Sequence, residues 1–149
     1  MNVTGFISAI CISGAQGMPR PKVDSGRLTA NLGFEGNRLS RGGDRQVCLF
    51  DEETYAALRA DNANVQAGTF GENLTISGID FASIQPGDQL KCGADAVIEI
   101  TIARKGCSNL KQFDARLPEL IVGRSGWMAS VLTSGDVSVG DSIELLTGK

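Results

Sequence analysis

Short apolar segments separated by glycine-containing turns dominate the sequence and limit the folds that the chain can adopt. Gly-Asp and Ser-Gly pairs, which favour tight turns, recur along it, as at Gly43-Asp44, Ser77-Gly78, Gly87-Asp88, Gly135-Asp136 and Gly140-Asp141. The chain contains 19 glycines, nearly double the usual share, and so has many positions suited to sharp turns. The segments between the turns are rich in Ile, Val, Leu and Thr. This pattern predicts a mostly β fold, either a barrel or a sandwich.

The apolar segments give the expected positions of the strands. We predict strands near Val3–Ser13, Arg27–Ala30, Arg45–Phe50, Glu72–Ser77, Gln89–Cys92, Ala96–Ala103, Trp127–Leu132 and Ser142–Leu146.

One helix is predicted with clear boundaries. Asp51 can cap its first turn, acidic residues follow where the helix dipole favours them, and Tyr55 and Leu58 share one face. We expect this helix to end near Asn62. A shorter helical turn is predicted over residues 80–84, before Pro-Gly stops it.

Length and charge set the broad class. A chain of 149 residues fits one domain, and we take residues 1–149 as a single unit. Its 14 basic and 17 acidic residues are mixed along the chain and give a net charge of −3, which argues against a nucleic-acid or anionic-membrane partner. The chain has no histidine, so Ser–His and Cys–His nucleophile pairs and HExxH zinc sites are excluded.

The N-terminal residues predict the compartment. The start, MNVTGFISAICISG, lacks the basic region and the cleavable apolar segment of a signal peptide. No apolar stretch approaches the length of a transmembrane helix. We therefore expect a cytoplasmic protein whose thiols stay reduced.

Cys107 is the candidate reactive residue. It follows a predicted buried strand, and Arg104, Lys105 and Gly106 come directly before it. Nearby cations stabilise a thiolate, which is the nucleophile and the metal ligand, and so lower the thiol pKa. We expect Lys105–Phe113 to be a loop followed by a helical turn. The alternative is an unreactive thiol in a surface loop.

The other three cysteines have different surroundings. Cys11 and Cys48 lie inside apolar strands, and Cys92 precedes a turn. No CxxC pair or other metal-ligand spacing is present. We therefore expect these three thiols to pack in the core.

Two basic loops and one polar segment could bind an anionic ligand. Residues 41–45, Arg-Gly-Gly-Asp-Arg, place backbone N–H groups between two guanidinium groups, but without the spacing of a P-loop. Arg124 lies in a second basic turn. At the start of a predicted strand, Glu72 and Asn73 should point in opposite directions, so at most one faces a given pocket. The alternative for each loop is an ordinary charged turn.

Together these segments resemble one known family. The ordered motifs are Gly33-Phe34-Glu35-Gly36-Asn37, Gly42-Gly43-Asp44-Arg45-Gln46-Val47, Phe70-Gly71-Glu72-Asn73-Leu74-Thr75, Ile84-Gln85-Pro86-Gly87-Asp88, Ile100-Thr101-Ile102-Ala103-Arg104-Lys105-Gly106-Cys107 and Gly123-Arg124-Ser125-Gly126-Trp127. They resemble the MOSC domain, named for the C-terminal region of molybdenum-cofactor sulfurases. The resemblance runs from about residue 3 to residue 146, nearly the whole chain.

The resemblance implies a mostly β, barrel-like MOSC fold with one clear helix and short helical turns. It also implies a functional cysteine at Cys107, used in relatives as a sulfur carrier or as a ligand to molybdenum. With a pterin-bound molybdenum (molybdopterin), Arg41, Arg45, Arg104 and Arg124 would be candidates for binding the cofactor's phosphate. Asn73 would lie at the pocket.

Two departures from the family pattern stand in this sequence. Many relatives have a His before the Gly-Gly-Asp segment, where this chain has Ser40-Arg41, and many have Pro before the cysteine, where it has Gly106. The chain also lacks the aminotransferase-like domain of the sulfurases, so we expect no pyridoxal phosphate in this chain alone.

Three functions remain open at this point. The first is a molybdenum-dependent oxidoreductase that reduces small N-hydroxylated or other N–O compounds with electrons from a separate electron-transfer protein, since the chain has no flavin, haem or Fe–S signature. The second is a sulfur carrier that holds on Cys107 a persulfide delivered by a cysteine desulfurase. The third is a non-catalytic module that binds an anion in its basic loops.

Overall fold

The computed structural model describes residues 3–14, 21–37, 43, 46–104, 116–117 and 126–146. Within these residues the chain forms eleven strands, the helix α1 and a short 3-10 helix, η1. Their bounds are β1 (Val3–Cys11), β2 (Lys22–Val23), β3 (Ser25–Thr29), β4 (Gly33–Phe34), β5 (Val47–Asp51), α1 (Glu52–Ala60), β6 (Leu74–Ser77), η1 (Phe81–Ser83), β7 (Gln89–Cys92), β8 (Ala96–Ala103), β9 (Trp127–Thr133), β10 (Gly135–Ser138) and β11 (Ser142–Leu146).

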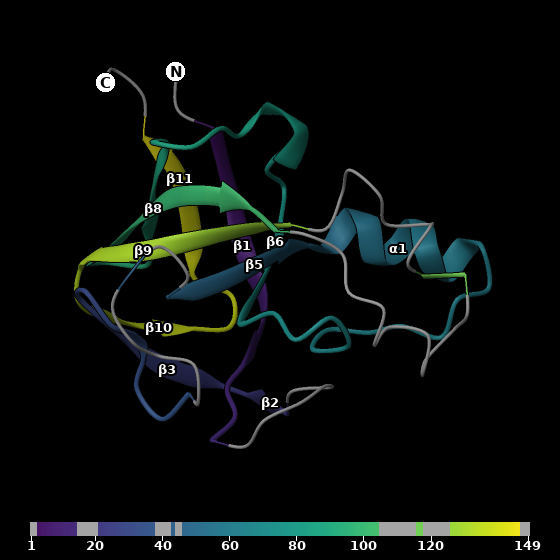
Figure 1. Ribbon diagram of the computed structural model, residues 1–149, viewed down its shortest axis with the longest axis horizontal. Helices are drawn as coiled ribbons and strands as arrows, with labels where there is room; N and C mark the ends of the chain where they lie inside the picture. The colour runs from purple at the N-terminus through teal and green to yellow at the C-terminus, as the bar shows by residue number, and fades with distance from the viewer. Residues whose placement is uncertain are drawn as a thin grey trace.

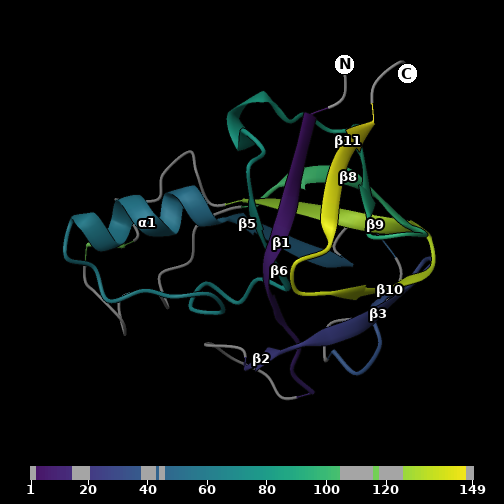
Figure 2. The same cartoon turned by 180° about the vertical axis from the view of Figure 1, so that it is seen from behind.

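In the described part of the chain, seven strands close into a barrel. They hydrogen-bond in the order β11-β7-β8-β9-β5-β6-β1, and β1 pairs with β11 to complete the ring. β5 and β6 run parallel, whereas the other barrel neighbours run antiparallel. Figures 1 and 2 show the barrel from opposite sides, with β1 and β11 side by side. The predicted mostly β, barrel-like fold is confirmed.

Alternating burial explains why these segments form a barrel. Along β8 the side chains of Ala96, Ile98 and Ile100 are buried, and those between them are partly exposed. This period of two directs every second side chain to the interior. Each fully buried Leu, Ile or Val contributes about 1.5–3 kcal/mol through removal of apolar surface from water. The buried barrel core includes Ile7, Ile10, Leu28, Phe34, Leu49, Leu74, Ile76, Leu90, Ile98, Val131 and Ile143.

A small second sheet covers one end of the barrel. It has the strand order β10-β3-β4. The sequence predicted a turn at Gly135-Asp136, and this is wrong, because both residues lie in β10 and pair with Leu28 and Arg27. At Gly135 a Cβ atom would lie 2.7 Å from the backbone nitrogen of Ala96. Glycine here permits two backbone segments to approach closely rather than making a turn.

Helix α1 projects away from the barrel, and the chain returns beneath it through residues 61–73 (Figure 1). We call α1 and the segment 61–73 the helical lobe. The predicted start is confirmed: Asp51 occupies the N-cap position, although its carboxylate accepts a hydrogen bond from the Thr54 hydroxyl at 2.9 Å rather than from the helix backbone. The helix ends at Ala60, and Asn62 adopts a left-handed conformation (φ 66°) that ends the turn.

The predicted helical turn after Asp80 is also present, as η1. The Asp80 carboxylate accepts hydrogen bonds from the Ala82 backbone at 3.0 Å and from the Ser83 hydroxyl at 2.8 Å. In the described part of the chain, no helix is long and apolar enough to cross a membrane.

Candidate functional site

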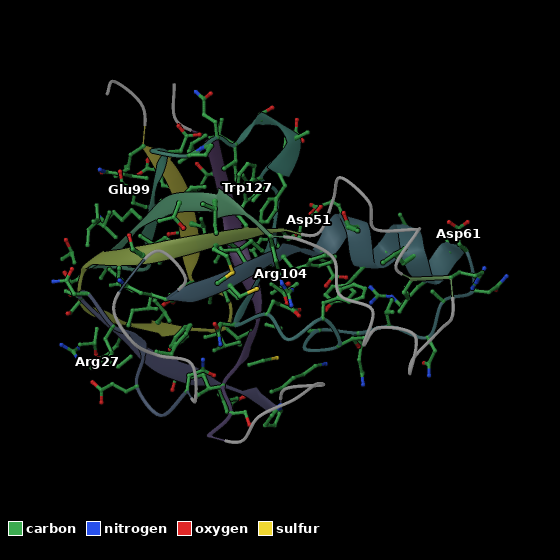
Figure 3. The ribbon with its side chains drawn as sticks, viewed as in Figure 1. Arg27, Asp51, Asp61, Glu99, Arg104 and Trp127 are labelled. Atoms are coloured by element: carbon green, nitrogen blue, oxygen red, sulfur yellow. The ribbon has the colours of Figure 1, made fainter. Side chains whose placement is uncertain are left out.

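The candidate site lies where β8 leaves the barrel beside the helical lobe. β8 ends at Ala103, which pairs with Trp127, and the Arg104 backbone N–H donates to the carbonyl of Gly126 at 3.0 Å. The Arg104 side chain is partly buried, and its Nη2 atom donates a hydrogen bond to the carbonyl oxygen of Phe70. Figure 3 shows Arg104 beside the strands at the base of α1. Arg104 therefore links the end of a barrel strand to the returning segment of the lobe.

The geometry of Gly126 fixes the strand ends at this point. Gly126 has a φ of 90°, and a Cβ atom there would lie only 2.0 Å from the carbonyl oxygen of Leu49. No other residue type fits without movement of β5 or β9. The close packing of Gly126 on β5 places its carbonyl where it accepts the Arg104 N–H.

Within the described residues, none of the ion pairs that the structure shows includes Arg104. A guanidinium group has five N–H donors, and a single carbonyl oxygen satisfies only a fraction of them. A partly buried arginine of this kind is suited to bind an anion such as a phosphate or carboxylate.

Three aromatic rings form the core of the helical lobe. Tyr55 and Phe70 stack with their centroids 5.2 Å apart and their planes 3° apart, and Phe50 contacts both at 4.6 and 4.8 Å. Leu58 and Leu117 are buried in the same cluster. This cluster holds the returning segment, with the Phe70 carbonyl, against α1.

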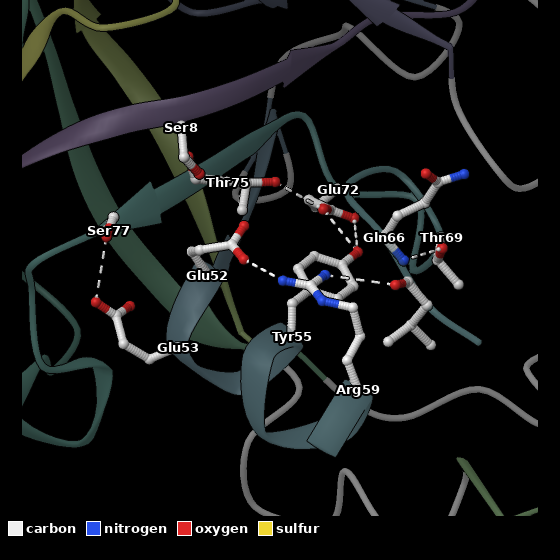
Figure 4. Close-up of polar contacts among 11 residues, drawn as sticks. Ser8, Glu52, Glu53, Tyr55, Arg59, Gln66, Thr69, Glu72, Thr75 and Ser77 are labelled. Carbon is white, nitrogen blue, oxygen red and sulfur yellow. Dashed lines mark hydrogen bonds and ion pairs between the residues drawn. The ribbon is translucent and has the colours of Figure 1, made fainter. Parts of the chain in front are cut away.

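A buried carboxylate lies next to these rings. Glu72 is fully buried, and its oxygens accept hydrogen bonds from the Tyr55 hydroxyl at 2.7 and 2.9 Å. The Thr75 hydroxyl donates to the same carboxylate at 2.8 Å (Figure 4). The Gly68 N–H also donates to it, at 3.0 Å. Burial, together with the Glu72 carboxylate, raises the pKa of Tyr55 far above its ordinary value, so its hydroxyl keeps the proton that it donates.

Asp51 is a second buried carboxyl group at the base of α1. Burial raises its pKa above the ordinary value, and the hydrogen bond from Thr54 opposes that shift. Asp51 and Glu72 are thus each held by a hydroxyl group of α1.

Asn73 braces three barrel strands. Its side chain is buried; Oδ1 accepts a hydrogen bond from the Cys48 N–H at 3.1 Å and Nδ2 donates to the Cys11 carbonyl at 3.1 Å. Its backbone N–H and carbonyl bond to the same two residues at 2.8 Å. As predicted, Glu72 and Asn73 therefore have different sets of partners. The assignment of Asn73 to a cofactor pocket stays a prediction.

Three of the four cysteines belong to the barrel. Cys11, Cys48 and Cys92 are buried, which confirms their predicted place in the core. Burial raises the pKa of Cys92 to about 12, so this thiol does not ionise at neutral pH. Cys107 and the arginines Arg41, Arg45 and Arg124 lie outside the described residues, and their convergence on one site with Arg104 stays a prediction.

Sequence reasoning did not identify the contact between Tyr55 and Glu72. The sequence predicts Tyr55 only as a residue of one helix face, and Glu72 only as one of two neighbours of which at most one faces a pocket. The signal available was one acidic residue inside the otherwise uncharged segment Phe70–Ile76, which becomes buried. A buried carboxylate requires several hydrogen-bond donors, so such a position indicates an organised polar cluster.

Three relatives align with most of this chain. A 127-residue stretch is 32% identical to a protein named reductase from Gibberella moniliformis, spanning 79% of this chain but 23% of that protein. Protein YiiM of Escherichia coli is 29% identical over 157 aligned residues, spanning 97% of this chain and 70% of YiiM. YflK of Bacillus subtilis is 32% identical over 124 residues, spanning 76% of this chain and 56% of YflK. This chain thus spans about a quarter of the reductase and just over half of YflK.

Solved structures have the same fold, and most of the chain matches one family. The YUAD protein of Bacillus subtilis has the same fold, with a TM-score of 0.85 over 100% of this chain and 99% of that one, at 17% identity. YiiM of Escherichia coli matches with a TM-score of 0.72 and 26% identity, over 100% of this chain and 71% of YiiM. Residues 36–144 match the MOSC domain. This match, over well more than half of the sequence, shows that the chain belongs to the MOSC domain family.

Proposed function

We propose that this protein binds a molybdenum cofactor and reduces N-hydroxylated or other N–O compounds, with Cys107 as the protein ligand to molybdenum. The observation that carries the proposal is Arg104, a partly buried cation whose described polar contacts are backbone groups and which stands three residues before Cys107. A relative with 32% identity is named reductase, which supports the redox assignment.

The cysteines support Cys107 as the ligand. Molybdenum binds a thiolate rather than a thiol, and the Cys92 thiol has a pKa raised to about 12 by burial. Cys11 and Cys48 are buried in barrel strands. Within the described residues, His, Cys, Asp and Glu do not gather in groups of three or more that could hold a metal. The proposal therefore assigns a single protein ligand and leaves the other ligands to the pterin.

In this proposal the residues of the chain bind and orient the reactants. Arg104 would bind the cofactor's phosphate through charge-assisted hydrogen bonds, together with Arg41, Arg45 and Arg124. When bound, the molybdenum group would supply two-electron redox chemistry. The overall reaction adds two electrons and two protons to an N–OH group and gives N–H and water. The electrons come from a separate redox protein.

Elemental analysis of protein from a host that makes the cofactor tests the proposal. The unaltered protein should carry molybdenum, and Cys107→Ser should lose it. Arg104→Gln should lower the molybdenum content by about tenfold, because one charge-assisted contact is worth roughly 1.5–3 kcal/mol. The matched control is Arg27→Gln, since Arg27 is an exposed arginine of β3 that pairs with Glu35 and Asp136. It should leave the molybdenum content unchanged.

The same samples separate the alternatives. One alternative predicts protein without molybdenum but with one additional sulfur on Cys107, measured as intact mass under non-reducing conditions. That result would mean that the protein is a sulfur carrier and not a reductase. Phosphate binding that requires Arg104 but survives Cys107→Ser, again without molybdenum, would leave only an anion-binding module.

A further inference from the structure

The buried carboxylate of Glu72 is held by neutral donors alone in the described structure. These donors are two hydroxyl groups, of Tyr55 and Thr75, and the N–H of Gly68. No arginine or lysine within the described residues forms an ion pair with Glu72. Burial of a carboxylate without a paired cation is unfavourable, and an apolar residue of similar size would fill this place at less cost. The carboxylate therefore depends on these three donors, which fix its place.

A continuous series of contacts leads from Glu72 to Arg104. Tyr55 donates its hydroxyl proton to Glu72, and the same hydroxyl oxygen accepts the backbone N–H of Phe70 at 3.4 Å. The carbonyl of Phe70 accepts the hydrogen bond from the Arg104 guanidinium. The stacked rings of Tyr55 and Phe70 hold the two residues in register. Glu72 thus fixes the direction of the Tyr55 hydroxyl, which fixes Phe70, which in turn contacts Arg104.

Hydrogen bonds also hold the turn that carries Phe70. Gln66 and Thr69 bond to each other twice: the Gln66 N–H donates to the Thr69 hydroxyl at 3.0 Å, and the Thr69 N–H donates to the Gln66 carbonyl at 2.9 Å. The Gly68 N–H is bound to Glu72, and Gly68 and Gly71 adopt φ values of 92° and 76°. The position of the Phe70 carbonyl is therefore set by the lobe rather than by Arg104.

We propose that Tyr55 and Glu72 are positioning residues that hold the Arg104 guanidinium in one orientation for an anionic group at the end of β8. This proposal rests on the proposed function for the identity of that group, the phosphate of the cofactor. An arginine side chain loses much rotamer freedom when it binds, and a fixed guanidinium has already lost it. The high pKa of Tyr55 supports this role, because the hydroxyl stays protonated and keeps its direction.

The first measurement needs no cofactor. In NMR spectra of the cofactor-free protein, the Arg104 Nε–Hε signal, assigned by its loss in Arg104→Gln, should be sharp and slow to exchange with water. In Tyr55→Phe, which keeps the stacked ring, this signal should broaden or average with those of exposed arginines. The matched control is Thr54→Val, which removes the other buried hydroxyl–carboxylate contact of α1, to Asp51. It should leave the Arg104 signal unchanged.

The second measurement is a double-mutant cycle on molybdenum content. Tyr55→Phe should lower the content by about fivefold to tenfold, and it should have no further effect in the Arg104→Gln background, because Tyr55 acts on the anion only through Arg104. A purely structural role would instead give additive losses, and Thr54→Val would then act like Tyr55→Phe. Glu72→Gln is the second variant and should behave as Tyr55→Phe does.

The outcomes separate this inference from the proposed function. An unchanged Arg104 signal in both Tyr55→Phe and Glu72→Gln would overturn the positioning role. Loss of the signal in those variants, with molybdenum absent from every sample including the unaltered protein, would support the positioning role and overturn the proposed function. Additive effects in the cycle would also overturn the positioning role.

Discussion

The barrel and the helical lobe have different kinds of core. In the described part of the chain, the barrel has a cluster of nineteen buried apolar residues, whereas the cluster of the lobe has seven and lies against a buried carboxylate that accepts the Tyr55 hydroxyl. A large apolar core contributes stability without directing any one side chain, while hydrogen bonds fix direction. The barrel therefore supplies most of the stability, and the lobe determines the position of Arg104.

Truncation of a buried side chain should have the largest effect on stability, and its result should differ between the barrel and the lobe. Ile98→Ala should lower the free energy of unfolding by about 2–5 kcal/mol, because it leaves a cavity in the barrel core. Leu58→Ala should open the lobe locally. Urea denaturation and amide hydrogen exchange measure both effects. In Leu58→Ala, exchange should become faster in α1 while the amides of β8 keep their protection. Equal loss of protection in both regions would show that they unfold as one unit.

Gly126, where the two regions meet, should give the next largest effect. Gly126→Ala places a methyl group against the Leu49 carbonyl at a φ of 90°, and we expect a loss of about 3 kcal/mol or more in the free energy of unfolding. The matched control is Gly36→Ala, since Gly36 has a φ of 81° but nothing within 4 Å of the added Cβ. There the backbone strain alone should cost about 1 kcal/mol. Similar losses in the two variants would disprove the close packing at Gly126.

Raising the pH should destabilise both regions, and the loss of stability should begin at a lower pH in the barrel than in the lobe. In the unfolded chain the pKa of Cys92 would be about 8.5 and that of Tyr55 about 10. In the folded protein burial raises the pKa of Cys92 to about 12 and that of Tyr55 higher still. The folded state therefore keeps protons that the unfolded state loses. Stability is full below these unfolded values and falls as the pH rises above them, by about 1.4 kcal/mol per pH unit and group.

Urea denaturation between about pH 8 and pH 11 tests this dependence. Cys92→Ala should remove the decrease in the free energy of unfolding that begins at the lower pH. Tyr55→Phe should remove the decrease that begins near pH 10. A slope that stays the same in Cys92→Ala would mean that the thiol ionises without unfolding of the barrel.

The smallest expected effects concern exposed ion pairs. Arg27 pairs with Glu35 at 3.4 Å and with Asp136 at 3.3 Å beside the barrel, and Arg59 pairs with Glu52 on the lobe. Because these groups are solvated, removal of either arginine should change the free energy of unfolding by less than about 1 kcal/mol. Thermal denaturation at low and high salt provides the measurement. A larger loss from Arg59→Gln than from Arg27→Gln would mean that surface charge, as well as hydrogen bonding, orders the lobe.

Local periodicity was sufficient to predict most of the fold. The predicted bounds of β7 and β8 match the structure, since alternating apolar residues and flanking turns define such strands without tertiary information. The strand β10 was missed because Gly135-Asp136 has the composition of a turn, and only the approach of Ala96 explains a glycine within a strand. The two-residue strands β2 and β4 carry too few residues to show any period.

The candidate site was less predictable for a physical reason. Arg104 could be selected from sequence because it follows an apolar strand and precedes a cysteine. The bond between Tyr55 and Glu72 joins residues seventeen positions apart across a turn, and no local pattern encodes such a distance. The sequence predicted that Glu72 and Asn73 face opposite ways, but their partners, on α1 and on β1 and β5, follow only from the assembled barrel.

The parallel pairing of β5 with β6 limits how the length of this protein can vary. Antiparallel neighbours such as β7 and β8 can be joined by a turn of a few residues, here 93–95. Two parallel strands need a connection of about a dozen residues or more, because the chain must first run back along the barrel. Residues 52–73 are that connection. Insertions between β5 and β6 are therefore tolerated far better than deletions, and a deletion long enough to remove α1 would leave β6 unable to reach its neighbour in the same direction.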